Sequence, residues 1–253
     1  MNRLPLIVLA VAGAALGDIV THNGQIFTPG FVVVNAPQPN TPLGGETLHL
    51  SLDVTANGAL PLPPLKEDSA SQIYNITIFL YSYDTGRNFT VSNATAVEDE
   101  NLSSLGNIME QETSSTVKHI NWIWPDCLVG NGQPSGKDSD RGTYNVSIHQ
   151  NFRLNDTDHY TIFDLPISVT NSIEENENRT SCDALANTIL QPGEINWEDS
   201  NQVGALFVPD NATTVEYDSA SNKDSAGTSF AQTLGSGGVR LMWGLLIARA
   251  LLG

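Results

Sequence analysis

The histidines are the residues best suited to bind a metal ion or to transfer protons. Three of the five stand in or beside segments with strand-like patterns: His119, His149 and His159. A turn predicted around Asn155 and Asp156 would bring His149 and His159 close together in a hairpin, and His119 would lie on a nearby strand. Three imidazoles on one sheet face would bind copper or zinc. The alternative is that these histidines are exposed side chains on a glycosylated face.

Signatures of other catalytic chemistry are missing from the sequence. It contains no G-x-S-x-G, no H-E-x-x-H, no P-loop and no dinucleotide fingerprint. The 28 Asp and Glu residues offer many pairs. Glycoside hydrolysis needs two carboxyl groups roughly 5 to 9 Å apart, and a sequence does not give that spacing. We therefore expect no catalytic residue and no cofactor, with a glycan-active hydrolase that uses paired carboxylates as an alternative.

Two tryptophans stand two residues apart in an alternating stretch. Trp122 and Trp124 lie within residues 116–128 and would point to the same face of a strand. Together on the surface they would form an aromatic platform of the kind that stacks on sugar rings. Buried, they would belong to the core, which is the first interpretation. We expect residues 116–128 to form the central strand of the domain.

The two cysteines predict a single disulfide. Cys127 and Cys182 are an even pair in a chain that we expect to be exported. The bridge would tie the segment after the last strand to the core. Free thiols as metal ligands have little support, because no other Cys or His stands at short spacing.

Eight N-x-S/T acceptor sequences occur without an intervening proline, and in so short a chain they predict a heavily glycosylated exported protein. They are Asn75, Asn88, Asn93, Asn101, Asn145, Asn155, Asn178 and Asn211. A glycan requires a solvent face, and in a strand the acceptor and its hydroxyl partner share a face. Residues 74–80 and 144–152 both satisfy this rule, with their apolar side chains on the other face.

Both ends of the chain are typical of processing signals. Residues 1–17 combine Arg3 with a short apolar run and small residues, which predicts a secretory signal peptide cleaved before Asp18. Residues 226–253 hold a polar spacer and an apolar tail, which predicts a GPI signal with attachment at Ser225. The alternative for the tail is an amphipathic helix packed on the domain.

The formal net charge is −17, and removal of both ends would take away three arginines and no acid. Such a body repels phosphate backbones and anionic lipid surfaces. We therefore expect no nucleic-acid partner, and membrane attachment only through the GPI anchor.

The patterns predict an all-β domain over residues 18–171, followed by a stalk. Strands are expected at 30–34, 47–54, 74–80, 144–152 and 160–170, separated by loops rich in proline and glycine. Pro166 in the last of them requires an edge or a bulge. Residues 172–225 are acidic and lack periodicity, which predicts a partly disordered glycosylated stalk. Its apolar residues would alternatively add a strand to a sheet edge.

A short motif refines the fold. Residues 140–144 read D-R-G-T-Y at the start of a strand, which resembles the tyrosine corner of immunoglobulin-like domains. The resemblance implies an antiparallel β-sandwich in which the Tyr144 hydroxyl bonds back to the upstream backbone and a tryptophan of 116–128 lies in the core. Val146 stands where the second cysteine of antibody domains would be, so their intersheet disulfide is absent.

The order of the parts resembles that of fungal GPI-anchored cell-surface glycoproteins. It implies an extracellular location at the plasma membrane or in the cell wall. The expected function is non-enzymatic: binding of wall glycans or surface proteins, or a structural role. The alternatives are the glycan-active hydrolase and a copper- or zinc-binding surface protein.

Overall fold

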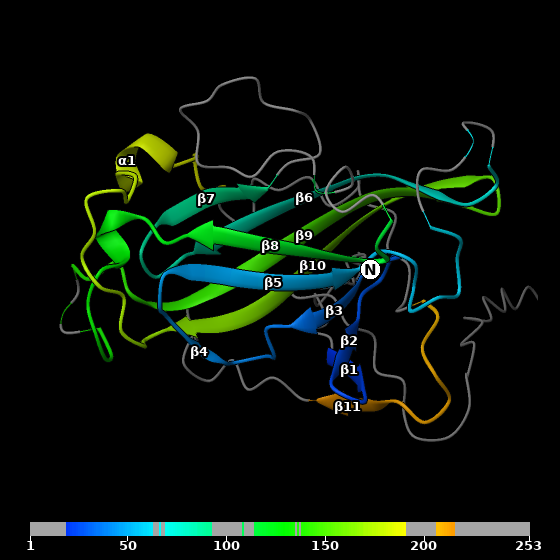
Figure 1. Cartoon of the computed structure of the whole chain (residues 1–253), viewed down its shortest axis with the longest axis horizontal. Helices are drawn as coiled ribbons and strands as arrows, with labels where there is room; N and C mark the ends of the chain where they lie inside the picture. The colour runs from blue at the N-terminus through cyan, green and yellow to red at the C-terminus, as the bar shows by residue number, and fades with distance from the viewer. Residues whose placement is uncertain are drawn as a thin grey trace, which may run out of the picture.

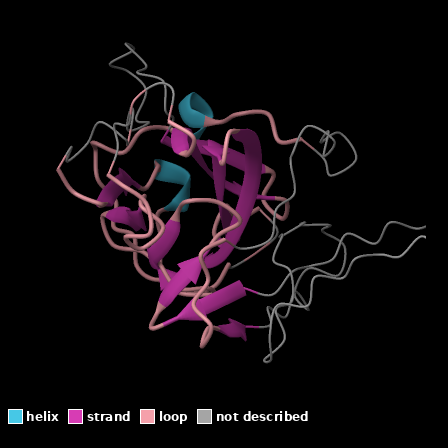
Figure 2. Ribbon diagram, turned by 90° about the vertical axis from the view of Figure 1, so that its right-hand side faces the viewer, coloured by secondary structure: helices cyan, strands magenta, loops and turns pink. Residues whose placement is uncertain are grey.

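The protein is an all-β molecule whose two sheets pack against each other around one main core (Figure 1). The computed structural model describes residues 19–62, 66, 69–92, 108, 114–134, 136, 138–190 and 206–215. Within these ranges the helical segments are η1 (Asp126–Leu128) and α1 (Cys182–Leu185) (Figure 2). No helix in the described ranges has the length and apolar character needed to cross a membrane.

Sheet A has the strand order β11-β1-β2-β3-β5-β8, and sheet B has the order β4-β10-β9-β6-β7. The strands of sheet A are β1 (Ile19–His22), β2 (Gln25–Phe27), β3 (Val33–Ala36), β5 (Thr47–Asp53), β8 (Val117–Ile123) and β11 (Thr213–Val215). The strands of sheet B are β4 (Pro42–Leu43), β6 (Gln72–Ser82), β7 (Arg87–Ser92), β9 (Gly142–Leu154) and β10 (Thr157–Val169). All pairings are antiparallel except that of β4 with β10.

The core forms where the alternating apolar faces of the two sheets meet. In β5 the leucines at 48, 50 and 52 are fully buried while His49 is exposed, as the period of two requires. In β9 the same rule buries Tyr144, Val146 and Ile148. The predicted all-β class is therefore confirmed. The alternation of apolar and polar side chains in β5 and β9, on which the prediction was based, is also observed.

The predicted central strand is an edge strand. Among the described strands β8 is the last of sheet A and pairs only with β5. Trp122 is nevertheless fully buried. Alternation depends on which face of a strand is covered, so it does not report the position of the strand within the sheet.

The β9–β10 hairpin has the predicted turn. Asn155 and Asp156 both adopt positive φ, at 49° and 62°, which fits a two-residue turn between twisted strands. Pro166 has the predicted edge position, because β4 pairs with β10 only at residues 168 and 169. The Pro166 carbonyl on that side accepts a hydrogen bond from the Asn40 amide at 2.7 Å.

A bulge changes the predicted face of one residue. The register of β6 on β9 shifts between Ile73 and Asn75, so Tyr74 leaves the apolar face on which alternation had placed it. Tyr74 is 40% exposed, and its hydroxyl donates to Asp158 at 2.8 Å.

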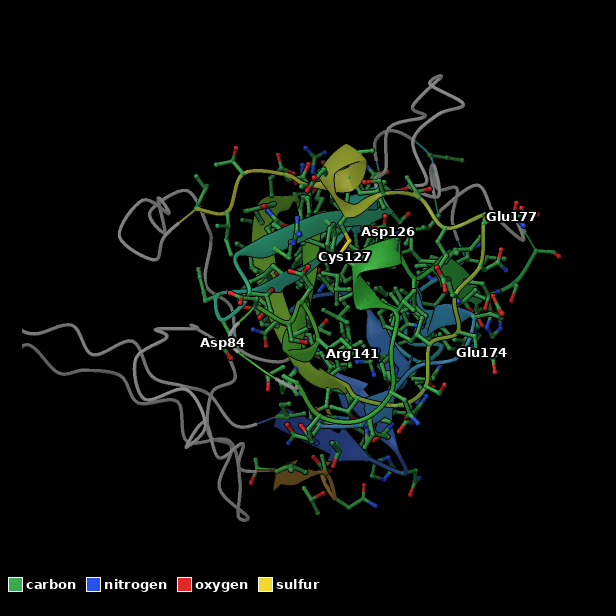
Figure 3. The ribbon with its side chains drawn as sticks, turned by 90° about the vertical axis from the view of Figure 1, so that its left-hand side faces the viewer. Asp84, Asp126, Cys127, Arg141, Glu174 and Glu177 are labelled. Carbon is green, nitrogen blue, oxygen red and sulfur yellow. A yellow bond between two sulfur atoms is a disulfide. The ribbon has the colours of Figure 1, made fainter. Side chains whose placement is uncertain are left out.

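One end of the two packed sheets is closed by the predicted disulfide, which is present between Cys127 in η1 and Cys182 in α1 (Figure 3). The Arg141 guanidinium donates to the carbonyls of Leu128 and Asn171 beside it. Arg179 donates to the Trp124 carbonyl at 2.8 Å. The bridge closes a loop of 55 residues, and in the chain-entropy model such a loop contributes about 4 kcal/mol of stability.

Part of the predicted stalk belongs to the folded body. Residues 172–190 run along one end of the two sheets, where Ile173 is buried and Ala186 forms a bridge to Phe89. β11 pairs with β1 at the edge of sheet A, so the alternative of an added strand is the one that the structure shows. The predicted domain boundary at residue 171 was based on the lack of hydrophobic periodicity after it. The three residues of β11 are all exposed, so they show no such periodicity although they form a strand.

Candidate functional site

A cluster of polar side chains lies on the outer face of sheet B, away from the core. Tyr81, Ser147 and Asp164 come from β6, β9 and β10, at positions that alternate with core residues. The hairpin register sets Ser147 directly opposite Asp164, and Tyr81 pairs with Asn145 one step away. Three long neighbouring strands thus place these polar groups together.

The Asp164 carboxyl group is the centre of this outer-face cluster. It is 5% exposed, and its Oδ2 accepts a hydrogen bond from the Tyr81 hydroxyl at 2.9 Å. Ser147 stabilises the charged form of the carboxyl group, although no described residue completes a hydrogen bond to Oδ1. Burial raises the pKa of Asp164 to about 6, because the charged form loses its hydration and the two hydroxyls offset only part of that cost.

His149 extends the cluster along β9. Its Nδ1 lies 2.6 Å from the Tyr160 hydroxyl, and its Nε2 lies 3.1 Å from the Ser147 hydroxyl. Burial lowers the pKa of His149 to about 4, so the imidazole is neutral through most of the physiological range. Both ring nitrogens have partners within the protein, which leaves neither nitrogen available to a metal ion.

The cluster contains a serine, a histidine and an aspartate, yet it is not arranged for nucleophilic attack. In a catalytic triad the carboxylate orients the histidine, whereas here His149 contacts Tyr160 and the carboxyl group lies beside Ser147. The Ser147 side chain is also buried, with the residue 3% exposed, so a substrate carbonyl has no approach. The arrangement acts as a buried hydrogen-bond network that joins three strands.

Ser147 and His149 share one face of β9, as the alternation of residues 144–152 predicts, whereas Asp164 and Tyr81 are not among the predicted site residues. A usable signal existed for Asp164. Residues at equal steps from a two-residue turn are cross-strand partners, and such counting outward from Asn155 and Asp156 pairs residue 147 with 164. Tyr81 carried no such signal, because β6 precedes the hairpin by more than 60 residues.

The three histidines predicted to form a metal site lie on separate surfaces. His119 is exposed on the outer face of sheet A, and His149 lies on the outer face of sheet B. His159 pairs with Phe152 across the β9–β10 hairpin and so lies on the opposite face of sheet B from His149. Its ring stacks on Phe152, with ring centroids 5.2 Å apart. The structure therefore does not bring these imidazoles together.

Both tryptophans of the predicted aromatic platform are in the core. Trp122 and Trp124 have no exposed surface, and their ring centroids are 6.1 Å apart. The Trp124 indole N–H donates to the Gly44 carbonyl at 3.2 Å. Stacking of sugars on these rings is thus incompatible with the fold, and core packing is the correct interpretation.

Asp126 lies against the disulfide, and one of its carboxylate oxygens accepts the Cys182 backbone N–H at 2.9 Å (Figure 3). The carboxylate and the two sulfur atoms lie within 4.8 Å of one another. Because both sulfurs are joined in the disulfide, they are not thiolates and cannot serve as metal ligands.

The described acceptor asparagines differ in exposure. Asn155, Asn178 and Asn211 are exposed, while Asn75 and Asn145 are half-buried. Asn88 is also half-buried, and its Nδ2 donates to the Thr188 carbonyl at 3.1 Å. Asn93, Asn101, Ser225 and the two predicted processing segments lie outside the described residues.

The acidic side chains with assigned partners are used in structural contacts. Asp140 and Asp158 form ion pairs with Arg87 and Arg153, each at 2.8 Å. Asp53 accepts the backbone N–H groups of Thr55 and Asn57 in the turn after β5. Asp164 has the raised pKa of a general acid, but no second described carboxyl group contributes to that shift.

Comparison of the chain with protein-family models, with curated proteins and with solved structures found no match.

Proposed function

We propose that this protein is a non-enzymatic glycoprotein of the cell surface or cell wall, built on an immunoglobulin-like β-sandwich. It binds wall glycans or surface proteins, or has a structural role there. The observation that carries the proposal is the position of the three exposed acceptor asparagines. Asn155 lies at the tip of the β9–β10 hairpin, Asn178 in the loop before α1, and Asn211 just before β11.

These positions are spread around the body in a way that suits glycosylation. Each exposed acceptor lies in a turn or loop, and none of the three carries a core contact. Glycans at such sites would cover several sides of the sandwich without disturbing the pairing of its strands. The disulfide agrees with export, because such bonds persist in oxidising compartments.

The immunoglobulin-like assignment is supported by the hydrogen bond of the tyrosine corner. The Tyr144 hydroxyl donates to the Asp140 carbonyl four residues upstream, at 2.6 Å. Two antiparallel sheets with a buried tryptophan in one of them fit the same interpretation.

The carboxyl groups with assigned partners give the hydrolase alternative no support, because Asp140, Asp158 and Asp183 are held by arginines and Asp53 binds turn amides. A membrane tether agrees with the position of β11. The described chain ends at Val215 on the edge of sheet A, beyond which the sequence continues toward the proposed attachment residue Ser225.

The intact mass of the protein isolated from its native host tests this proposal. It is measured before and after treatment with an N-glycosidase and with a phosphatidylinositol-specific phospholipase. We expect a chain that starts at Asp18, loses several N-glycans and ends in a lipid-linked residue near Ser225. A chain that retains residues 241–253 and carries no glycan would refute both the tether and the glycoprotein.

A further inference from the structure

Two histidines on the outer face of sheet A lie side by side. β5 and β8 are antiparallel, with His49 opposite Asn121 and His119 opposite Ser51, so the two histidines are diagonal neighbours. Both side chains are exposed, and their ring centroids are 5.5 Å apart. His119 is one of the predicted metal ligands and His49 is not, because the proximity of His49 depends on the pairing of strands more than 60 residues apart.

A hydrogen bond with Asn121 orients the His49 ring. The Asn121 side-chain oxygen lies 2.8 Å from His49 Nδ1. An amide oxygen only accepts hydrogen bonds, so Nδ1 is the donor in this contact and Nε2 is the ring nitrogen left to bind a metal ion. Metal-binding histidines have this same arrangement, in which the second ring N–H is held by an oxygen acceptor.

The separation of the two rings fits a shared metal ion. An imidazole nitrogen lies about 2 Å from a bound ion, so two rings on one ion have centroids roughly 4.5 to 6.3 Å apart, from a right-angled to a linear arrangement. The observed 5.5 Å is within this range. The ring planes meet at 19°, so the His119 ring must rotate to direct a nitrogen at the ion. No hydrogen bond from the described part of the chain restrains that ring.

We propose that His49 and His119 form a surface site for one divalent copper ion, with His49 Nε2 as one ligand and a nitrogen of His119 as the other. Copper(II) is the ion of choice, because imidazole sites bind it more tightly than the other divalent metals of its row. The net charge of −17 raises the local concentration of cations around the protein.

The site has two protein ligands, and water fills the other coordination positions. Within the described ranges, no third His, Cys, Asp or Glu side chain lies close enough to join this pair as a ligand. A two-histidine site exchanges its ion readily, so it suits capture of copper at the surface better than permanent retention. This inference does not depend on the proposed function or on the glycans.

Titration of the full-length mature protein with copper(II) tests the site. Affinity is measured by calorimetry in competition with glycine, and the ligands are identified by electron spin-echo spectroscopy, which detects the remote nitrogen of each bound imidazole. We expect one ion per chain with two coupled imidazoles. H49A and H119A should each weaken binding at least tenfold and leave a single-imidazole signal.

Two further variants separate the site from non-specific effects. H22A removes a histidine at the end of β1 and should leave affinity and spectrum unchanged. N121A keeps both ligands but removes the acceptor for Nδ1, and should weaken binding roughly tenfold. Circular dichroism checks that each variant folds. Wild-type affinity in H49A or H119A, or an equal loss in H22A, would overturn the proposal.

Discussion

Asp164 and the half-buried His149 belong to the same hydrogen-bond network, and their pKa values are shifted in opposite directions. Between about pH 4 and 6 the folded protein holds a proton on Asp164 and none on the His149 acceptor nitrogen. The unfolded chain, with ordinary pKa values of 3.8 and 6.5, holds that proton on His149 instead. The number of bound protons is nearly equal in the two states, so the contributions of this pair to the pH dependence of stability largely cancel.

Single substitutions should reveal the two cancelling effects. In D164N only His149 remains, and the unfolded chain binds the extra proton below pH 6.5. The free energy of unfolding should then fall by about 3 kcal/mol as the pH drops from 6.5 to 4. In H149Q only Asp164 remains, and the folded state binds the extra proton. The free energy of unfolding should then fall by about 2 kcal/mol as the pH rises from 4 to 6.

Urea unfolding at several pH values measures these slopes. The exposed variant H119Q serves as a control and should show the same pH profile as the wild type. If D164N and H149Q showed the same slope as each other, the proposed opposition between the two groups would be wrong.

Asn88 should differ from the exposed acceptors in its glycan occupancy. A glycan is attached through Nδ2, the atom that donates to the Thr188 carbonyl, and the Asn88 side-chain oxygen is also buried. A sugar at this position would displace residues 186–190 from β7. Glycopeptide mapping of the native protein should find Asn88 unmodified and Asn155 occupied. A fully occupied Asn88 would mean that residues 186–190 do not pack on β7 in the mature protein.

At the scale of elements, the start of β9 depends on Tyr144. The Y144F variant keeps the buried ring but loses the hydroxyl that donates to the Asp140 carbonyl. We expect the free energy of unfolding to fall by about 1 to 2 kcal/mol, because a buried hydrogen bond is lost and its acceptor is left without a partner. The matched control is Y83F, which removes an exposed hydrogen bond of 3.2 Å to Leu190 and should change stability by less than about 0.5 kcal/mol. Equal losses in the two variants would argue against a special role for the corner.

The long strands could be predicted from the sequence because their alternation is a local property. β5, β9 and β10 lie close to the predicted ranges, and the predicted buried faces of β5 and β9 are the observed ones. β1, β4 and β11 are two to four residues long, too short to show a period. The edge position of β8 and the contact of Asp164 with Tyr81 depend on pairing between distant strands, which the pattern within one strand does not encode. The same limit concealed the proximity of His49 to His119.

The whole molecule includes the segment that follows the sandwich strands. Val208 and Ala212 pack on a small cluster of Val20, Phe27 and Val33 on sheet A. V208D would place a charge against this cluster and should lower the free energy of unfolding by about 1 to 3 kcal/mol. V215D changes an exposed residue of β11, so its effect should be within about 0.5 kcal/mol. Thermal unfolding compares the two, and an unaffected V208D would indicate that the segment does not contribute to the folded body.

The pairing of β11 with β1 also has a mechanical consequence if the chain is tethered beyond Val215. A pull on the tether would reach the sandwich through three paired residues of an edge strand, so this pairing would open before the core carried any load. The chain from Leu190 to Val215 could then extend to at most about 85 Å. The disulfide lies upstream of that segment and would stop further unravelling at Cys182. The protein would thus act as a short extensible link under force, with its folded body and its paired histidines intact at the end.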